Sequence, residues 1–257
     1  MTVGRPSVTV DAFHRGAFDL VQPAAGGHRA GMDAMVLAAA VPDAFSGRVA
    51  DLGSGAGAAG LAVLSRCQNA KVTLIERSRE MLDYANASLA LESNRSFSGR
   101  AVVIQADIEA RGKDRHAAGL DDNSFDFAIM NPPFNSANDR RTPDPLKADA
   151  HVMNNQLIEN WVKTAAALVK ARGGFAVIIR PGSLRELLDA MKGRFGGIQI
   201  KPLLPHAGKV AIRVVARGIK GSRAELTIEP PLVLHPARGS GFTVEAEAVI
   251  NGQTCLY

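Results

Sequence analysis

Two consecutive prolines, Pro132 and Pro133, constrain the fold of this chain most strongly. They follow the apolar run Phe125–Met130, which is typical of a buried parallel strand. Proline has no N–H group to donate to a strand ladder, so this strand must stop at Asn131. Ligands of open α/β sheets bind at the carboxyl ends of the strands. We therefore expect Asn131-Pro132-Pro133-Phe134 to lie in a binding site.

The residue types in this stretch suit the chemistry of a planar nitrogen. The nitrogen of a nucleobase amine or a side-chain amide is a poor nucleophile because its lone pair is delocalised. The side-chain carbonyl of Asn131 and the backbone carbonyl of Pro132 could each accept one N–H hydrogen bond and free that lone pair. Phe134 would stack on the planar group. The alternative is a simple strand exit, because Asn-Pro often begins a turn.

A glycine-rich turn marks a second part of the expected site. Residues 48–52 read as a strand that runs into Gly53 and Ser54, and Gly55, Gly57 and Gly60 complete the spacing G-x-G-x-x-G. Glycines allow positive φ angles and a close backbone approach to a ligand, and the next helix directs its N–H groups toward it. By themselves these glycines would also fit a nicotinamide-dependent oxidoreductase.

Carboxylates at neighbouring strand ends argue for a different cofactor. Asp51 precedes the glycines and is placed to receive the ammonium of a cofactor that carries an amino acid. Glu76 ends the strand at 72–75 and could accept both ribose hydroxyls of an adenosine. Asp107 follows a strand at 102–104 and could bind the adenine amino group, with Ile108 against the ring. Hydride transfer has no use for the Asn-Pro-Pro-Phe stretch.

The remaining segments predict alternating strands and helices, with additional segments at the start and the end of the chain. Residues 8–10 and 18–21 suggest a hairpin, and a polar glycine-rich segment at 22–33 precedes a helix at 35–40. That segment either closes over a ligand, with Asp33 in the first helical turn as a candidate cofactor-binding residue, or is an ordinary linker capped by Asp33. Ser78 is expected to cap a helix, and the chain at 109–123 and 135–153 is expected to form loops.

The second half of the chain predicts the rest of the sheet. An apolar stripe over residues 157–169 predicts a helix in which Trp161 belongs to the core and does not contact a cofactor. A strand at 174–179 is followed by a helix with a capping box of Ser183 and Glu186. Strands at 198–204 and 209–217 close the sheet, residues 224–228 could add another, and residues 239–257 form a weakly determined tail.

Basic side chains are candidates for contacts with a polyanion. Lys209, Arg213 and Arg217 are expected to share one strand face, which is either simply solvated or contacts an RNA backbone. Arg140 and Arg141 lie in the loop after Phe134, together with acidic residues. A formal net charge of +5 is compatible with a polyanionic partner.

Composition limits the class of protein. In the 257 residues no apolar run approaches the roughly 18 needed to cross a bilayer, and the start lacks the apolar block of a signal peptide. Cys67 and Cys255 are too few for a disulfide framework, and the six histidines lack metal-ligand spacing. We expect a cytoplasmic protein with no membrane anchor and no metal.

Taken together, these motifs resemble class I S-adenosylmethionine (SAM) methyltransferases that act on planar nitrogens. Motifs outside the core resemble more narrowly the bacterial tRNA(Val) adenine-N6 methyltransferase family, which modifies the adenine just 3′ of the anticodon. The core motifs are residues 51–57, Glu76, Asp107 and residues 131–134, and the outer motifs are residues 22–23, 28–33, 220–224 and 230–235. Phe134 departs from the tyrosine that is frequent in such motifs, so a phenolic hydrogen bond would be lost while stacking survives.

The resemblance implies an α/β Rossmann-like fold, with a seven-stranded mixed sheet, helices on both faces and an antiparallel final hairpin. Residues 1–47 would form the hairpin and a glycine-rich cofactor cover, 48–217 the methyltransferase core and 218–257 a C-terminal extension packed on it. SAM would lie over the glycine turn with its methyl group facing Asn131, and tRNA would be the partner.

Three alternatives stay open at this point. A protein-glutamine methyltransferase would use the same chemistry, but such enzymes usually carry a separate helical N-terminal domain, and only about 47 residues precede the first core strand. An N-methyltransferase of rRNA or DNA is the second alternative. The third is a non-catalytic RNA-binding subunit, although such a subunit need not keep both Asn131 and Asp51.

Overall fold

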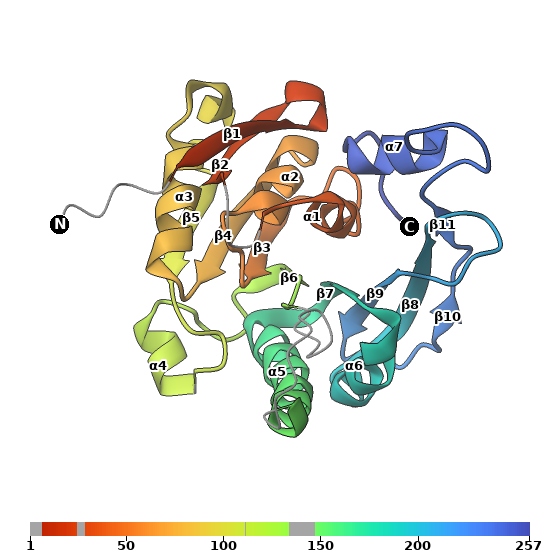
Figure 1. Cartoon of the computed structure of the whole chain (residues 1–257). Helices are drawn as coiled ribbons and strands as arrows, with labels where there is room; N and C mark the ends of the chain where they lie inside the picture. Colours follow the sequence, from red (N-terminus) through yellow and green to blue (C-terminus); the bar gives the residue numbers. More distant parts are fainter. Residues whose placement is uncertain (1–6, 25–28, 111, 134–146) are drawn as a thin grey trace.

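The computed structural model describes residues 7–24, 29–110, 112–133 and 147–257, with backbone only for 147–155. Phe134, Arg140, Arg141 and the glycine pair at 26–27 lie outside the described residues. A mixed sheet forms the centre of the molecule, and a two-stranded antiparallel hairpin of β1 and β2 packs beside it (Figure 1). The hairpin predicted at the start of the chain is therefore confirmed.

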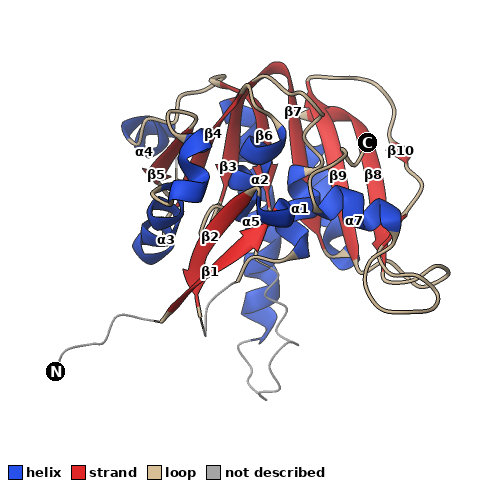
Figure 2. Ribbon diagram, turned by 90° about the horizontal axis from the view of Figure 1, so that it is seen from above, coloured by secondary structure: helices blue, strands red, loops and turns tan. Residues whose placement is uncertain are grey.

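The sheet has seven long strands and two short ones, in the order β10-β8-β9-β7-β6-β3-β4-β5 with β11 also paired to β8. Strands β3 to β7 run parallel, and β9 lies antiparallel between β7 and β8 (Figure 2). The expected mixed sheet with a reversed final hairpin is confirmed. The strands are β1 Val8–Phe13, β2 Phe18–Pro23, β3 Gly47–Leu52, β4 Ala70–Glu76, β5 Ala101–Gln105, β6 Phe125–Met130, β7 Val169–Ile179, β8 Phe195–Leu204, β9 Arg213–Lys220, β10 Thr227–Ile228 and β11 Leu232–Val233.

Helices cover both faces of this sheet (Figure 1). One apolar cluster joins the sheet to α1, α2, α3 and α7, and a second cluster joins it to α5 and α6. Strand β6 shows the alternation that makes this possible, because Phe127 and Ile129 belong to the first cluster while Ala128 and Met130 belong to the second. The helices are α1 Met32–Ala38, α2 Ala58–Arg66, α3 Arg79–Leu89, α4 Gly112–Ala117, α5 Lys147–Leu168, α6 Leu184–Met191 and α7 Val244–Ile250.

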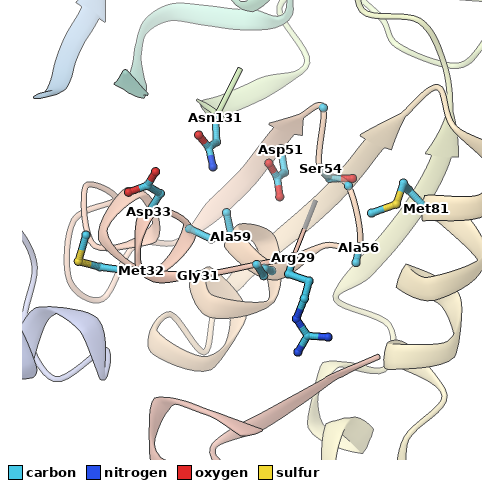
Figure 3. Close-up of a pocket in the computed structure, with 15 residues that line it drawn as sticks. Arg29, Gly31, Met32, Asp33, Asp51, Ser54, Ala56, Ala59, Met81 and Asn131 are labelled. Carbon is cyan, nitrogen blue, oxygen red and sulfur yellow. The ribbon is translucent and has the colours of Figure 1, made fainter. Parts of the chain in front are cut away.

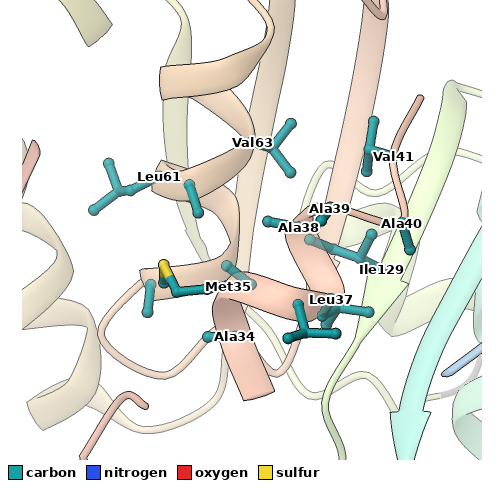
Figure 4. Close-up of a cluster of buried hydrophobic side chains, with 14 of the residues drawn as sticks. Ala34, Met35, Leu37, Ala38, Ala39, Ala40, Val41, Leu61, Val63 and Ile129 are labelled. Atoms are coloured by element: carbon teal, nitrogen blue, oxygen red, sulfur yellow. The ribbon is translucent and has the colours of Figure 1, made fainter. Parts of the chain in front are cut away.

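The first cluster places α1 firmly against the sheet (Figure 4). Met35, Leu37 and the alanines that follow are almost completely buried against α2 and Ile129. Small alanine side chains let helix α1 pack closely, and this fixes the position of Asp33 in its first turn. The beginning of α1 is therefore held at the edge of the sheet where β6 ends.

Three boundaries differ from the expectations. The segment 109–123 contains helix α4, whose Arg115 is buried and paired with Asp122. Helix α5 begins at Lys147, within the stretch expected to be a loop. Strand β9 begins only at Arg213, since residues 205–212 form the connection from β8 and Ile212 returns an N–H to the carbonyl of Leu203.

Two further expectations are corrected, one at the start of α6 and one in the C-terminal tail. Ser183 precedes α6 but makes no side-chain capping hydrogen bond, so the predicted capping box is absent. The tail at 239–257 is ordered: Thr243 caps α7 by accepting from the Ala246 N–H. Leu256 is buried, and its N–H donates to the Ala39 carbonyl at 2.7 Å. The tail therefore holds α1 from the outside.

Candidate active site

Two cavities meet at the carboxyl ends of β3, β4, β5 and β6. The first has a volume of about 310 Å³ and is lined by residues that include Asp33, Asp51, Ser54 and Asn131 (Figure 3). The second has a volume of about 330 Å³ and is lined by residues that include Glu76, Asp107, Ile108 and Trp161. Gly53, Gly55, Met81 and Asn131 line both cavities, so the two form adjoining halves of one site.

The turn after β3 and the helix that follows it each require glycine at one position, for different reasons. Gly53 has a φ of +69°, and a Cβ atom there would collide with the ring of Trp161. Gly60 lies in helix α2 against β4, where a Cβ would collide with Leu74 and lie 3.0 Å from the Asp51 carboxylate. The backbone of the turn therefore passes directly over the sheet edge, close to whatever occupies the cavities.

Asp51 is a buried carboxylate with one backbone partner. Its side chain is 2% exposed, and Oδ2 accepts the Gly60 N–H at 2.9 Å. Burial raises the pKa of Asp51 to about 7, the Gly60 hydrogen bond opposes this shift, and the negative charge of Glu76 adds to it. A carboxylate held in this state gains most from a cationic ligand, so Asp51 fits the expected ammonium contact.

Glu76 is fixed by the turn that it faces. One oxygen accepts the Gly55 N–H at 3.0 Å, and the other accepts the Ser78 N–H at 2.8 Å. Each carboxylate oxygen has two lone pairs, so both can still accept a hydroxyl group. The half-buried side chain lines the second cavity, which agrees with a contact to a ribose diol.

Part of the wall of the second cavity comes from the segment that follows β5 and from α5. Asp107 is exposed, and one of its oxygens accepts the Glu109 N–H at 2.8 Å. Ile108 is buried, with its carbonyl accepting the Thr164 hydroxyl at 2.6 Å. Trp161 is 8% exposed and lines this cavity, so the expectation that it belongs to the core alone is too narrow. Periodicity showed the buried stripe but not that α5 crosses beneath the glycine turn.

Asn131 has a free acceptor where the two cavities meet. Its Oδ1 atom is buried and has no hydrogen-bond partner among the described residues, and the same holds for Ser54 Oγ. Buried polar atoms in proteins are nearly always paired, so an unpaired amide oxygen on a residue that lines both cavities points to a donor supplied by a bound ligand. Pro132 is buried, and Pro133 is exposed and lines the second cavity. The two prolines hold the end of β6 in place.

The basic side chains that were expected to share one strand face do not form one surface. Lys209 is exposed but lies outside β9, so the prediction that it shares a strand face with Arg213 and Arg217 is wrong. Nε of Arg213 instead donates to Asp33 Oδ2 at 2.7 Å, at the rim of the first cavity. The Arg217 guanidinium donates to Gln199 and lies 4.2 Å from the centre of the Tyr257 ring.

The described part of the chain lacks two features. No group of three or more His, Cys, Asp or Glu side chains is arranged there to hold a metal ion. None of the described helices is long and apolar enough to cross a membrane.

The residues present fit SAM. Asp51 would bind the ammonium of SAM, and Glu76 would bind its ribose. Asp107 and Ile108 would contact the adenine, and the backbone of Gly53 and Gly55 would lie against the cofactor. A parallel sheet reversed at its last strand, with this glycine turn and an Asn-Pro-Pro strand end, defines a class I SAM-dependent methyltransferase. The chain belongs to the methyltransferase small domain family, whose model matches residues 29–201. Its cofactor is S-adenosylmethionine.

Solved structures confirm the fold. The chain is 41% identical to a protein from Agrobacterium tumefaciens whose crystal structure is described as that of a predicted O-methyltransferase. That likeness covers 87% of this chain and 97% of the other, with a TM-score of 0.76. The structure of M. jannaschii TYW2 in complex with AdoMet matches 86% of this chain and 89% of the other, at 11% identity and a TM-score of 0.55, and shows the fold alone.

Two relatives of known name act on RNA. The chain is 26% identical over 166 residues, 64% of its length, to a tRNA1(Val) (adenine(37)-N6)-methyltransferase from Pedobacter heparinus. It is 29% identical over 89 residues, 35% of its length, to a ribosomal RNA large subunit methyltransferase G from Pseudoalteromonas translucida. The matches span 65% of the first relative and 21% of the second, less than two thirds of either.

Proposed function

We propose that this protein is an enzyme that uses SAM to methylate the exocyclic N6 of an adenine in tRNA, at the position 3′ of the anticodon. The observation that carries the proposal is the buried, unpaired Oδ1 of Asn131 where the two cavities meet. An aromatic amine presents N–H groups that such an acceptor can bind. This substrate would also place the protein in the cytoplasm.

The chain's residues would act on the amine itself. When bound, SAM supplies an electrophilic methyl group on a sulfonium. Asn131 Oδ1 would accept one N–H of the amine, and the backbone carbonyl of Pro132 would accept the other. As the nitrogen takes up the methyl group it gains positive charge, so both contacts become stronger in the transition state than in the ground state. The proton then leaves the cationic nitrogen to solvent.

The choice of tRNA rests on similarity and charge. The Pedobacter heparinus relative is named for methylation of a tRNA adenine, and its match covers 64% of this chain. The net charge of +5 favours association with a polyanion. Phe134, the stacking residue of the proposal, and Arg140 and Arg141, its proposed phosphate contacts, lie outside the described residues.

O-methylation is a second candidate, because the Agrobacterium tumefaciens protein is described as a predicted O-methyltransferase. Transfer to a hydroxyl oxygen requires a base to remove its proton. Of the two carboxylates that line the first cavity with Asn131, Asp51 is the proposed contact of the cofactor's ammonium, and Asp33 is ion-paired with Arg213. This arrangement favours the amine, which needs an acceptor and no base before transfer.

A labelling experiment separates these functions. The protein would be incubated with methyl-labelled SAM and, in separate reactions, total tRNA, rRNA and a protein extract, followed by digestion of labelled RNA to nucleosides. We expect label in tRNA as N6-methyladenosine, absent with Asn131→Ala. Label in rRNA alone would favour the second RNA substrate, label in protein would favour a glutamine side chain, and a 2′-O-methylated nucleoside would establish O-methylation. Each of these results would overturn the tRNA adenine assignment.

A further inference from the structure

Three aromatic rings form a column on the surface, at a distance from the cofactor cavities. The centres of the His235 and Phe242 rings are 5.1 Å apart with an interplanar angle of 18°, so these two rings stack, and the His206 ring lies 5.6 Å from His235 and is tilted by 45° to it. His206 is exposed, and Phe242 is 39% exposed. We call His206, His235 and Phe242 the ring column. Phe242 is an apolar ring left partly in water beside two imidazoles, and such a surface cluster can serve as a contact site.

Backbone contacts hold both imidazoles in place. Nδ1 of His206 lies 3.1 Å from the Pro236 carbonyl, and Nδ1 of His235 lies 2.6 Å from the Gly241 carbonyl. In the neutral form each Nδ1–H therefore donates to the backbone, which leaves Nε2 as an acceptor for another group. The column is thus oriented without using the second nitrogen of either ring.

The ring column lies on the same edge of the sheet as Asn131. Strand β8 runs parallel to β7 because both are antiparallel to β9, and β11 is parallel to β8. His206 follows the end of β8, and His235 follows the end of β11. Three strand spacings separate β6 from β8 in the sheet order, which is about 14 Å at about 4.8 Å each, and β8 continues from the level of Met130 at Ile200 to Leu204, which adds about 13 Å along the strand at about 3.3 Å per residue. A short stretch of single-stranded nucleic acid can cross that distance.

The charged residues of the two loops that carry the column have one sign, while Glu245 follows in the first turn of α7. The two loops, residues 205–212 and 234–243, contain Lys209 and Arg238 and no Asp or Glu. Both basic side chains are exposed. Stacking surfaces with basic groups beside them are the features by which proteins bind single-stranded nucleic acids, since every base has a π face and every nucleotide a phosphate.

We propose that the ring column is a stacking platform for a nucleobase of the RNA substrate, a few nucleotides from the base held at Asn131, with Lys209 and Arg238 beside its phosphates. This inference deepens the proposed function and rests on it for the identity of the RNA. An adenine that enters the cavities must leave its neighbours in the strand. A nucleotide near the extruded adenine loses a stacking partner, and its base would stack on the ring column instead.

Binding and catalysis would be measured separately. Binding would be followed by fluorescence anisotropy of a labelled oligouridine of about 12 nucleotides, which contains no adenine and fits the usual range of site sizes. Catalysis would be followed as kcat and KM for a tRNA transcript. Phe242→Leu and His206→Ala are the test variants, and Phe242→Trp keeps a stacking face. His116→Ala, on the half-exposed histidine of α4, is the matched control.

We expect Phe242→Leu and His206→Ala to weaken oligouridine binding by about fivefold or more, as loss of one base–aromatic stack does. The KM for tRNA should rise by a similar factor at unchanged kcat, Phe242→Trp should restore both values, and His116→Ala should change neither. Unchanged binding in both test variants, or a wild-type protein that does not bind oligouridine, would overturn the platform. Concentration-dependent dimerisation that Phe242→Leu abolishes, with RNA binding intact, would assign the column to a protein contact instead.

The two proposals fail separately. A wild-type protein that binds oligouridine through the column, but places no methyl group on tRNA, would overturn the adenine assignment and leave the platform. A wild-type protein that methylates tRNA adenine, with unchanged KM in the column variants, would overturn the platform alone.

Discussion

Arg213 and Asp33 form an ion pair across 180 residues of sequence, with Nε and Oδ2 2.7 Å apart. Asp33 begins α1 and Arg213 begins β9, so the pair ties the start of α1 to the reversed end of the sheet. The sequence suggested separate roles for them, one toward the cofactor and one toward RNA. In the structure Asp33 lines the first cavity, and Arg213 is its ion-pair partner.

This pair should contribute measurably to stability. Its side chains are only 24% and 20% exposed, so we expect a coupling energy of about 1–3 kcal/mol between Asp33→Asn and Arg213→Gln. The measurement is a double-mutant cycle by urea unfolding. The exposed pair Arg15–Glu247, at 58% and 48%, is the matched control and should couple by no more than about 1 kcal/mol. Equal coupling in both pairs would show that burial of the first pair has no consequence.

Asp51 should make stability and cofactor binding depend on pH in opposite directions. Because its pKa of about 7 lies above the ordinary 3.8, the folded protein keeps a proton that the unfolded chain has lost between these values. The free energy of unfolding without cofactor should therefore fall as pH rises from about 4 to about 7. In Asp51→Asn this contribution should be absent, and thermal unfolding of both proteins across that range measures the difference.

SAM affinity should change the other way over the same range. Binding of an ammonium requires the ionised carboxylate, so affinity should weaken as pH falls below about 7. Calorimetry between about pH 5.5 and 7 avoids the titration of the ligand's α-amino group, ordinarily at about 7.7–8.0. A flat affinity profile would remove Asp51 from the cofactor site.

Asn131→Ala should reduce methyl transfer far more than it weakens SAM binding. We expect a loss on the order of 100-fold or more in single-turnover rate, as for other preorganised groups that stabilise developing charge. Asn131→Asp keeps an acceptor and should retain a trace of the activity that alanine lacks. Asn86→Ala, on the exposed face of α3, is the control. A near-normal rate in folded Asn131→Ala would mean that the residue only ends the strand.

Glu76 should bind the cofactor through more than its charge. Glu76→Ala removes acceptors for the Gly55 and Ser78 N–H groups as well as for the ribose, and we expect SAM affinity to fall by roughly 1.5–3 kcal/mol per lost charged hydrogen bond. Glu76→Gln keeps one acceptor oxygen and should lose less. Isothermal titration with SAM tests this order, and NAD should give no comparable binding. Unchanged SAM affinity in both variants contradicts the assignment.

Gly60→Ala, in the helix that follows the glycine turn, should disturb that turn without removing a charged group. The added Cβ would collide with Leu74 and approach the Asp51 carboxylate, so we expect a loss of about 1–3 kcal/mol in stability and weaker SAM binding. Gly182→Ala is the control, because no atom lies within 4 Å of the corresponding Cβ. Thermal unfolding with and without SAM compares them. Equal unfolding temperatures would mean that the turn can shift freely.

Much of the fold and the site follows from local properties of the sequence. Short apolar runs predicted β3, β4 and β6, because a parallel strand at the centre of a sheet is buried on both faces. Pro132 ended β6 because proline lacks a donor, and Gly53 allowed the turn because only glycine tolerates its φ there without a Cβ collision. The carboxylates at the strand ends then had to converge on one edge of a parallel sheet.

Tertiary structure alone decided the contacts between segments far apart in the chain. Trp161 lies under Gly53 because of where α5 crosses the sheet, and Arg213 meets Asp33 because the last strand inserts between β7 and β8. The tail became ordered only through burial of Leu256 against α1, since its own sequence has no strong periodicity. Such contacts depend on strand order and helix placement, which local propensities do not specify.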